Sequence, residues 1–376
     1  IMSVIQFSCE KTLLKNAISV ASPAVAAKSS IPALAGLLIQ ANSQELTISG
    51  FDMQTGIRTS VSANITETGD VVISAKVLGD IIRRMPDSVI TLSANDRNSV
   101  RFSCGEINYD DIVGLSAADF PDLPEVEDNF SITLPQKTLK AMIEETAFAV
   151  STNESRPVHT GALFEAGDGN LTMAAVDGFR LAVRKEPLTK IDGGSFSFVA
   201  PGSALNEVKT ICGDSEESVE ITLGERHILF NAGKTQLICR RLEGEFLDYR
   251  NAIPRKNPIA VTVETKALIS SIDRVSVVIN DKMKSPVRCV FEQDKVTISA
   301  RTGIGAAKDV CGLSGDGGGL EIGFNNRYLM DALRYAPAGT VKIEMNTGVS
   351  PAVIVPVEGE ENFLYMVLPV RLKGGA

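Results

Sequence analysis

A chain of 376 residues with 44% hydrophobic and 22% charged residues has the composition of an ordinary globular protein, long enough for two or three domains. No stretch approaches the roughly 18 to 20 apolar residues of a membrane-spanning helix, and residues 1–5 lack the basic and apolar segments of a secretion signal. The net charge of −9 argues against a large basic surface for nucleic acid. The six scattered cysteines contain no Cys-x-x-Cys pair, which favours reduced thiols in a cytoplasmic protein over disulfides or a zinc site.

The first third of the chain predicts strands interrupted by two helices. One helix begins near Lys11, and a β-prone run at 46–52 ends in turn residues, as at the start of a hairpin. A second helix begins near Ser74 and stops before Pro86, because the proline ring removes a hydrogen-bond donor. The alternating run 89–92 predicts a further strand.

The same elements recur in the middle third. An amphipathic helix begins near Lys137, and the apolar runs on either side of Asp177-Gly178 predict a hairpin within 171–184. Asp-Gly is a strong hairpin signal because glycine supplies the positive φ that such turns need. A helix from 201 and a strand at 219–223 follow.

The last third repeats the order once more, with a helix near Lys266, a hairpin run at 296–303 and a helix from 325 that ends before Pro337. A strand at 341–345 closes it. The three hairpin runs begin at Leu46, Leu171 and Val296, an interval of 125 residues each time, and loops that end in proline precede them at 28–32, 156–157 and 282–286. A period of this length is the size of a domain.

We therefore predict three repeated domains, at residues 1–127, 128–254 and 255–376, in the α+β class. Each has about two helices packed on mainly antiparallel sheet, because the short turns leave no room for parallel crossovers. The linkers are expected around 120–128 and 246–258, which contain clustered proline and acidic residues.

No catalytic or metal site is indicated. His159 and His227 lie far apart and at different repeat positions, which does not suggest a catalytic triad or a zinc site. The glycine-rich runs 303–305 and 315–319 match neither a dinucleotide fingerprint nor a P-loop, so both are expected to be loops. We expect no cofactor and no catalytic residue.

Basic residues recur on the predicted helices at spacings that place them on one helical face. They are Lys11, Lys15, Lys76, Arg83, Lys137, Lys140, Lys266, Arg274, Arg327 and Arg334. Each face taken alone is an ordinary solvated surface, but the recurrence in three copies favours a diffuse positive lining for sequence-independent phosphate contact. The aromatic content of 5%, with no tryptophan, favours duplex over single-stranded nucleic acid.

The whole chain resembles the β subunit of bacterial DNA polymerase III, the family of replicative sliding clamps. The stretches that carry the resemblance are 117–121, 177–182, 242–250 and 365–372. The resemblance implies three DNA-clamp domains per chain and a head-to-tail homodimer that closes into a ring of six units. It also implies a cytoplasmic, nucleoid-associated processivity factor of a DNA-directed DNA polymerase, a nucleotidyltransferase complex. This subunit itself would have no polymerase or 3'-5' exonuclease activity.

The resemblance implies that the ring encircles double-stranded DNA without reading its sequence. Its other partners are the clamp loader, the replicative polymerase α subunit and further proteins with a clamp-binding motif, and no membrane. Such peptides insert into a pocket between the second and third domains. Matching positions are Val176, Gly178, Phe179, Arg180, Leu181, Leu247, Ala252, Pro351, Met366, Val367, Leu368, Pro369, Val370 and Arg371.

This sequence departs from the family pattern at three points. Phe179 stands where histidine is usual, Leu247 replaces a frequent proline, and the chain continues as residues 373–376 past the usual end. By motif position, the DNA contacts are Lys28, Asn153 and Arg156, and repeat logic adds Lys282 and Lys284. Ring closure is expected to pair an edge strand near 103–112 with one near 277–279 of the partner chain, through Ser103, Ile107, Tyr109, Val278 and Ile279.

Two other functions remain open from the residues alone. An enzyme with converging carboxylates in a cleft would lose turnover on Asp177→Asn. A β-rich scaffold for protein partners would be a stable monomer at micromolar concentration, whereas a clamp would be a dimer.

Overall fold

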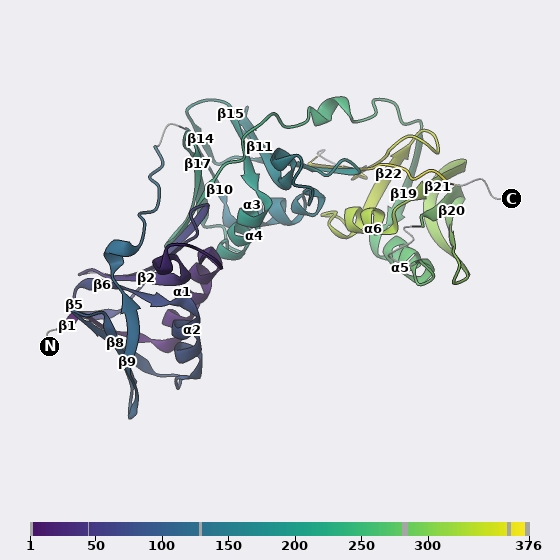
Figure 1. Ribbon diagram of the computed structural model, residues 1–376. Coiled ribbons are helices and arrows are strands. Elements are labelled where there is room, and N and C mark those ends of the chain that lie inside the picture. Colours follow the sequence, from purple (N-terminus) through teal and green to yellow (C-terminus); the bar gives the residue numbers. More distant parts are fainter. Residues whose placement is uncertain (1–2, 44, 128–129, 280–284, 359–361, 373–376) are drawn as a thin grey trace. The chain divides into compact units, whose positions relative to one another are not determined.

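The computed structural model describes residues 3–43, 45–127, 130–279, 285–358 and 362–372. The chain divides into two compact units (Figure 1). The first contains Ile1–Lys140, Thr189–Gly194 and Ser203–Arg241, and the second contains Ala141–Leu188, Ser195–Gly202 and Leu242–Ala376. The predicted middle domain thus contributes to both units, and the predicted boundaries after residues 127 and 254 stay predictions.

The described residues form six α-helices, two in each repeat, as predicted. They are α1 (Lys11–Ala21), α2 (Ala75–Arg84), α3 (Gln136–Glu144), α4 (Gly202–Ile211), α5 (Thr265–Ser276) and α6 (Asn326–Arg334). Short 3-10 helices are η1 (Ser22–Ala24), η2 (Pro32–Ala35), η3 (Ala117–Asp119), η4 (Ala147–Ala149), η5 (Pro157–Thr160) and η6 (Tyr249–Asn251). The helices α1 and α2 pack against each other in the first unit, and α5 and α6 do so in the second (Figure 1).

The first unit is built on a 14-stranded sheet in the order β14-β10-β16-β17-β18-β4-β3-β2-β6-β9-β8-β7-β1-β5. Its strands are β1 (Ser3–Glu10), β2 (Gly36–Ala41), β3 (Leu46–Phe51), β4 (Thr55–Val61), β5 (Asn64–Glu67), β6 (Gly69–Ser74), β7 (Val89–Asn95), β8 (Ser99–Cys104), β9 (Ile107–Leu115), β10 (Phe130–Pro135), β14 (Lys190–Asp192), β16 (Ser218–Leu223), β17 (His227–Ala232) and β18 (Thr235–Arg240). The antiparallel pair β4 and β18 joins strands of the first and second repeats into this one sheet.

The second unit is built on a 10-stranded sheet in the order β15-β11-β12-β13-β24-β23-β22-β19-β21-β20. Its strands are β11 (Gly161–Gly167), β12 (Asn170–Val176), β13 (Arg180–Pro187), β15 (Phe196–Pro201), β19 (Ile259–Glu264), β20 (Val287–Arg301), β21 (Ala306–Phe324), β22 (Thr340–Met345), β23 (Ala352–Pro356) and β24 (Phe363–Val367). Here the antiparallel pair β13 and β24 joins the second and third repeats, as β4 and β18 join the first and second.

The three predicted hairpins are confirmed, and one kind of hydrogen bond explains their common register. Asp177 Oδ1 accepts from the backbone N–H groups of Phe179 at 2.9 Å and Arg180 at 3.0 Å, which shapes the turn between β12 and β13. Asp52 accepts in the same way from two N–H groups between β3 and β4, and Thr302 Oγ1 accepts from Ile304 between β20 and β21. A short acceptor side chain is therefore needed at the start of each turn.

Two local predictions are corrected. The glycine-rich run 315–319 lies inside strand β21 instead of in a loop, at a point where the pairing with β20 is irregular. Gly315, Gly318 and Gly319 have positive φ there, and a side chain on Gly317 would collide with Phe291, so the glycines form a bulge. In the first two repeats the proline loops lead into the 3-10 helices η2 and η5 before the next strand begins.

Apolar side chains of the helices are buried against the sheets. In the first unit, Leu14 and Ile18 of α1 and Leu78 and Ile82 of α2 belong to one continuous core cluster. All six cysteines are free and buried, as predicted from their scattered positions. Burial raises the pKa of the Cys239 and Cys289 thiols to about 12, so these thiols stay protonated.

Candidate functional site

An apolar cluster covers one face of the sheet in the second unit. Val176, Leu181, Met366 and Val353 lie directly opposite one another on the neighbouring strands β12, β13, β24 and β23. All four are buried and belong to a cluster that also includes Ala174 and Val355. Because side chains alternate between the two faces of a strand, this register gathers them on one face.

The segment between the second and third repeats packs on this cluster. Tyr249, 4% exposed, is part of it, and Leu242, Phe246 and Ile253 pack against it. The Tyr249 hydroxyl donates to Glu165 Oε2 at 2.9 Å, and Arg250 donates to both carboxylate oxygens of Glu165, at 3.1 and 2.7 Å. Burial and the adjacent Glu165 raise the pKa of Tyr249, which keeps its hydroxyl a donor.

The turn beside the cluster presents an exposed aromatic ring. Phe179 is 58% exposed and stacks on Tyr328 of α6, with ring centroids 5.9 Å apart. Leu247 is 43% exposed. These two side chains, at the positions where the sequence departs from the family pattern, therefore lie at the accessible margin of the site.

Arg180 is held by the protein itself. Its guanidinium is paired with Asp177 at 2.9 Å and with Asp331 of α6 at 2.6 Å, and it lies 4.5 Å from the centroid of the Tyr328 ring. With only 12% of its side chain exposed, it positions the turn against α6. That Arg180 also lines the peptide pocket stays a prediction.

Several of the predicted pocket residues belong to the apolar cluster or pack against it. They are Val176, Leu181, Met366 and Leu368. Val367 is fully buried and lies opposite Arg180 in the sheet, on the face away from the cluster, and its place in the pocket lining stays a prediction. Residues of the cluster that the sequence analysis missed are Val158, Leu163, Ala174, Val183, Val199, Leu242, Phe246, Tyr249, Ile253, Val353, Val355 and Leu364.

The chain after β24 runs along the margin of the cluster. Leu368 N–H donates to the carbonyl of Phe179 at 2.9 Å, and Val370 N–H donates to the carbonyl of Gly323 at 2.8 Å. A Cβ on Gly323 would lie 2.5 Å from the backbone carbonyl oxygen of Val370, so only glycine fits at this position. Of the other predicted pocket positions, Pro351 and Pro369 are half-buried, whereas Ala252 and Arg371 are exposed. Gly178 is also exposed and lies in the turn between β12 and β13.

A separate pocket of about 470 Å³ lies beside the linker segment. Arg156 and Leu247 both line it, so the structure brings a predicted DNA residue and a predicted peptide residue to one place. His159 also lines it and stacks edge-on against Phe246 at 5.3 Å. Burial, helped by Arg156, lowers the pKa of His159, so the imidazole is neutral at pH 7.

The predicted DNA contacts that the structure describes are exposed. Lys28 lies in a loop of the first unit, and Asn153 and Arg156 lie in the loop before η5 in the second. Asn153 Oδ1 accepts from the Ser155 N–H at 3.0 Å, which shapes that loop. Lys282 and Lys284 lie outside the described residues.

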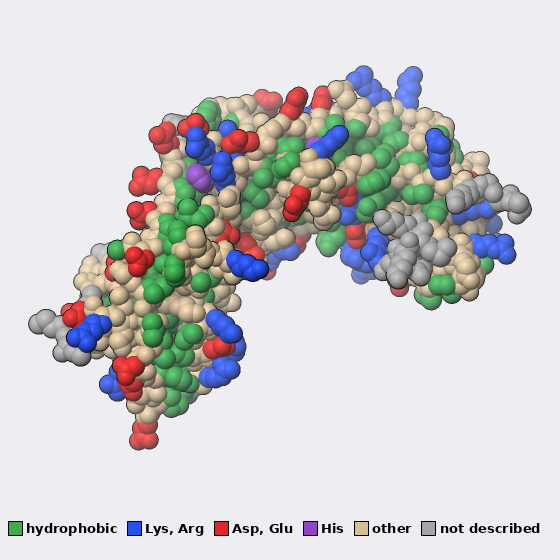
Figure 2. All heavy atoms as spheres, viewed as in Figure 1, with side chains coloured by type: hydrophobic (Ala, Val, Ile, Leu, Met, Phe, Trp, Pro, Cys, Tyr) green, Lys and Arg blue, Asp and Glu red, His purple; other side chains and the backbone are tan. Residues whose placement is uncertain are grey.

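The basic side chains on the helices differ in how many partners they have. Lys137 pairs with Glu216 and Lys140 pairs with Asp214, so these two contribute less to a positive surface. Lys15 and Lys76 line a groove between α1 and α2, and no ion pair within the described ranges involves either of them. Figure 2 shows Lys and Arg side chains over these two helices, with acidic side chains between them.

The predicted dimer contacts lie on β8, on β9 and in the turn after α5, and they stay predictions. Ser103 lies on β8, which pairs on both sides, so it is not on a sheet edge. Ile107 and Tyr109 lie on β9, whose pairing with β6 is limited to Gly114 and Leu115 among the described residues. Val278 and Ile279 lie in a turn after α5 and not in a strand, because the helix ends at Ser276.

The surface around that turn is nevertheless apolar. Val277 is 79% exposed, Ile304 is 66% exposed and Val310 on β21 is 51% exposed. The Thr302 hydroxyl donates to the Val278 carbonyl at 2.6 Å, which holds the turn against the β20–β21 hairpin. Within the described part of the chain, the backbone pairing of β21 with β19 is limited to Ser314.

No three His, Cys, Asp or Glu side chains in the described residues come together as a metal site. None of the helices in the described ranges has both the length and the apolar character to cross a membrane.

Comparison with known proteins assigns each third of the chain. The family models of the DNA polymerase III beta subunit match residues 5–124 (N-terminal domain), 133–248 (central domain) and 250–371 (C-terminal domain). A beta sliding clamp of Synechocystis sp. is 32% identical, with 97% of this chain and 98% of the relative covered. A beta sliding clamp of Staphylococcus aureus is 30% identical over 93% of this chain and 94% of the relative.

Solved structures agree with this assignment. The DNA polymerase sliding clamp of Bacillus subtilis has a TM-score of 0.94 and 27% identity, covering 99% of this chain and 100% of that one. The beta subunit of the Streptococcus pyogenes DNA polymerase has a TM-score of 0.92 and 28% identity, covering 98% and 100%.

Proposed function

This chain belongs to the DNA polymerase III beta subunit family of DNA sliding clamps, and we propose that it encircles duplex DNA as a head-to-tail homodimer. Its function is that of a processivity factor without catalytic activity of its own. The observation that carries the assignment is the succession of three clamp domains, matched at residues 5–124, 133–248 and 250–371, which agrees with the threefold order of helices and hairpins.

The proposed DNA contact is electrostatic and independent of sequence. Lys15 and Lys76 in the groove between α1 and α2, together with the exposed Lys28, Asn153 and Arg156, support it. Such contacts hold phosphates loosely and weaken as salt rises, while a closed ring prevents escape. The domain boundaries at 127 and 254 and the contribution of Lys282 and Lys284 are part of the same proposal.

The test is retention on circular and linear DNA. Protein loaded with a clamp loader and ATP onto a nicked circular duplex should stay bound, and cutting the circle once should release it. Equal retention on circles and on linear molecules with free ends would rule out the topological link. Lys15→Ala with Lys76→Ala should reduce retention at moderate salt and flatten its salt dependence.

We propose that partner proteins dock short apolar peptides at the margin of the apolar cluster that contains Val176, Leu181, Met366 and Val353. The exposed Phe179 and Leu247 at its margin would contact such a peptide first. The partners are the replicative polymerase, the clamp loader and other proteins with a clamp-binding motif. Their common site would lie in the bacterial cytoplasm, on the nucleoid.

The peptide proposal is tested with two exposed side chains, whose replacement leaves the core intact. Phe179→Asp or Leu247→Asp should weaken binding of an apolar clamp-binding peptide by about tenfold or more, because each places a charge where apolar surface is buried. Arg97→Asp, on the exposed β7–β8 turn, is the control and should bind normally. Unchanged affinity in both variants would move the peptide site elsewhere.

Ring closure is proposed to join the open edge of β9 in one chain to the β20–β21 region and the turn at Val277 of the partner. Exposed apolar side chains at both places support this, namely Ile107 and Val113 on β9, and Val277 and Val310 on the other side. Val277→Asp should convert a dimer into a monomer, as measured by light scattering after size exclusion. A monomeric unmodified protein at micromolar concentration would contradict the ring.

A further inference from the structure

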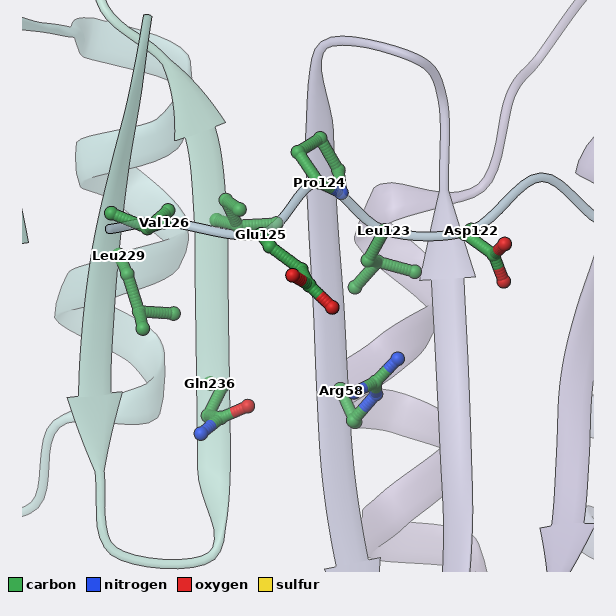
Figure 3. Close-up of a pocket in the computed structure, with 9 residues that line it drawn as sticks. Arg58, Asp122, Leu123, Pro124, Glu125, Val126, Leu229 and Gln236 are labelled. Atoms are coloured by element: carbon green, nitrogen blue, oxygen red, sulfur yellow. The ribbon is translucent and has the colours of Figure 1, made fainter. Parts of the chain in front are cut away.

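A polar groove crosses the sheet of the first unit beneath the segment 122–126. Arg58 of β4 and Gln236 of β18 lie directly opposite each other and line it. The row continues on either side through Ser49 of β3, opposite Arg58, and Asn231 of β17, opposite Gln236. Figure 3 shows Arg58 and Gln236 on neighbouring strands, with Leu123 and Glu125 extending from the segment above them. The groove has a volume of about 780 Å³.

This groove occupies the same place in its sheet as the apolar cluster does in the second unit. Gly56 of β4 pairs with Ile238 of β18, just as Leu181 of β13 pairs with Met366 of β24. Two residues further along, Arg58 pairs with Gln236 where Val183 pairs with Leu364. The two sites thus have the same construction and opposite chemistry.

Part of the groove is filled by the chain itself. Leu123 packs over Gly56, where a Cβ would lie 2.9 Å from Leu123 Cδ2 and 3.0 Å from Ile238 Cγ2. The apolar subsite is therefore occupied, and the accessible part of the groove is the polar row. An apolar peptide has no place there.

Two polar groups of the row have unused hydrogen-bonding capacity. Arg58 is half-buried, its Nε donates weakly to Ser49 Oγ at 3.4 Å, and no carboxylate in the described ranges pairs with it. The buried Oδ1 of Asn231 has no hydrogen-bond partner in the described structure. Groups removed from water without partners are costly, so a ligand that supplied these partners would be stabilised.

A second pocket continues the groove. It has a volume of about 590 Å³ and shares Arg58 and Gln236 with the first, so the two form one elongated site. Thr47, Ser60 and Lys234 line this extension. The length and the polar lining fit an extended segment rather than a compact molecule.

We propose that this groove, defined by Arg58 and Gln236, is a second docking site, for an extended polar peptide that places one carboxylate on Arg58. A guanidinium binds a carboxylate through paired, charge-assisted hydrogen bonds, and the amide of Gln236 bonds to a peptide backbone. The site does not depend on DNA binding or on ring closure, so it goes beyond the proposed function.

The charges around the groove favour a peptide over nucleic acid. Asp122 and Glu125 line the first pocket, and Glu45 lines the second. These carboxylates repel a chain of phosphates more strongly than a peptide with one carboxylate, and they accept hydrogen bonds from a peptide that also carries a basic or amide side chain.

The test uses a phage-displayed library of random linear heptapeptides as its probe. The library is panned against the full-length protein and depleted on Arg58→Met, which keeps the aliphatic stem but removes the charge. Binders of the apolar cluster are lost in the depletion step because that site is intact in the variant. Arg97→Met is the matched control and should retain every enriched clone.

We expect enriched peptides that share an Asp or Glu and bind Arg58→Met at least tenfold more weakly than the unmodified protein. Replacing that acid by its amide should cause a similar loss. No clone that distinguishes the two proteins, or clones without a shared acid, would overturn the proposal. Equal unfolding midpoints for both proteins show that the variant is folded.

Methyl NMR of the full-length protein locates the bound peptide. The enriched peptide should shift the signals of Ile238, Leu229 and Leu123, which line the groove, and leave Val353 unchanged. Shifts confined to the apolar cluster would contradict the assignment. If an oligothymidylate produced the same shifts with the same dependence on Arg58, the occupant would be nucleic acid and the peptide proposal would fail.

Discussion

Arg180 Nη1 donates to Asp331 Oδ2 at 2.6 Å, and through this contact the Asp177-Gly178 turn of the second repeat is joined to helix α6 of the third. The same guanidinium pairs with Asp177 and lies over the Tyr328 ring. One side chain thus orients the exposed Phe179, which follows Asp177 in the turn and stacks on Tyr328.

Loss of Arg180 should affect both stability and docking. Arg180→Ala removes the guanidinium that Asp177 and Asp331 share and leaves Asp331 only its longer contact with Arg334 at 3.8 Å. It should lower the free energy of unfolding by about 3 kcal/mol. Asp331→Asn should cost less, because Asp177 still pairs with the guanidinium. Urea unfolding followed by circular dichroism measures both. A loss below about 1 kcal/mol for Arg180→Ala would show that the pair is only a surface contact.

Replacing Met53 by glycine should raise the free energy of unfolding. It has φ of +73° in the turn between β3 and β4, at the position that Gly178 occupies in the second repeat with φ of +89°. A side chain in this conformation is strained, and Met53 is 51% exposed, so little packing is lost. Met53→Gly should stabilise the protein by about 0.5 kcal/mol, whereas Gly178→Ala should destabilise it by about 1 kcal/mol. Thermal unfolding of both variants measures these changes. Stability changes of the same sign in the two variants would contradict the prediction.

Glu145 should make stability depend on pH. Burial raises the pKa of its carboxyl from an ordinary 4.5 to about 7, although Arg184 lies 2.5 Å away. A carboxyl with a raised pKa contributes its full stability below its unfolded value, and this contribution is lost as pH rises through 7. Its share of the fall in unfolding free energy between pH 6 and 8 should be about 1 kcal/mol. Glu145→Gln should lack that share, and identical pH profiles for both proteins would be evidence against the raised pKa.

Tyr249 should anchor the linker over the apolar cluster. Tyr249→Phe removes the hydroxyl that donates to Glu165 and should cost about 1 kcal/mol, because the ring stays packed while the bond is lost. Hydrogen exchange of the segment 246–253 should become faster in the variant. Exchange at the unmodified rate would show that Arg250 alone holds the segment through Glu165.

Residues near one another in sequence were predictable because their interactions are local. The hairpin at Asp177-Gly178, the ends of α2 and α6 before prolines and the 125-residue period depend on turn chemistry, proline sterics and side-chain periodicity. The family resemblance rests on such contiguous stretches as well. The glycine-rich run 315–319 was mispredicted because a bulge and a loop use the same residue type, and only the pairing with β20 distinguishes them.

The sequence by itself therefore determined the repeat, the fold class and the family, whereas the tertiary structure decided the sites. Whether Met366 or Val367 faces the apolar cluster depends on strand register, which is set by pairing with β13 across some 180 residues of chain. Strand and helix packing also brings together Arg180 and Asp331, which are distant in sequence. In the same way, Arg58 lies opposite Gln236 only because β4 pairs with β18. Contacts between residues far apart in the chain leave no local pattern, so a physical argument from spacing cannot reach them.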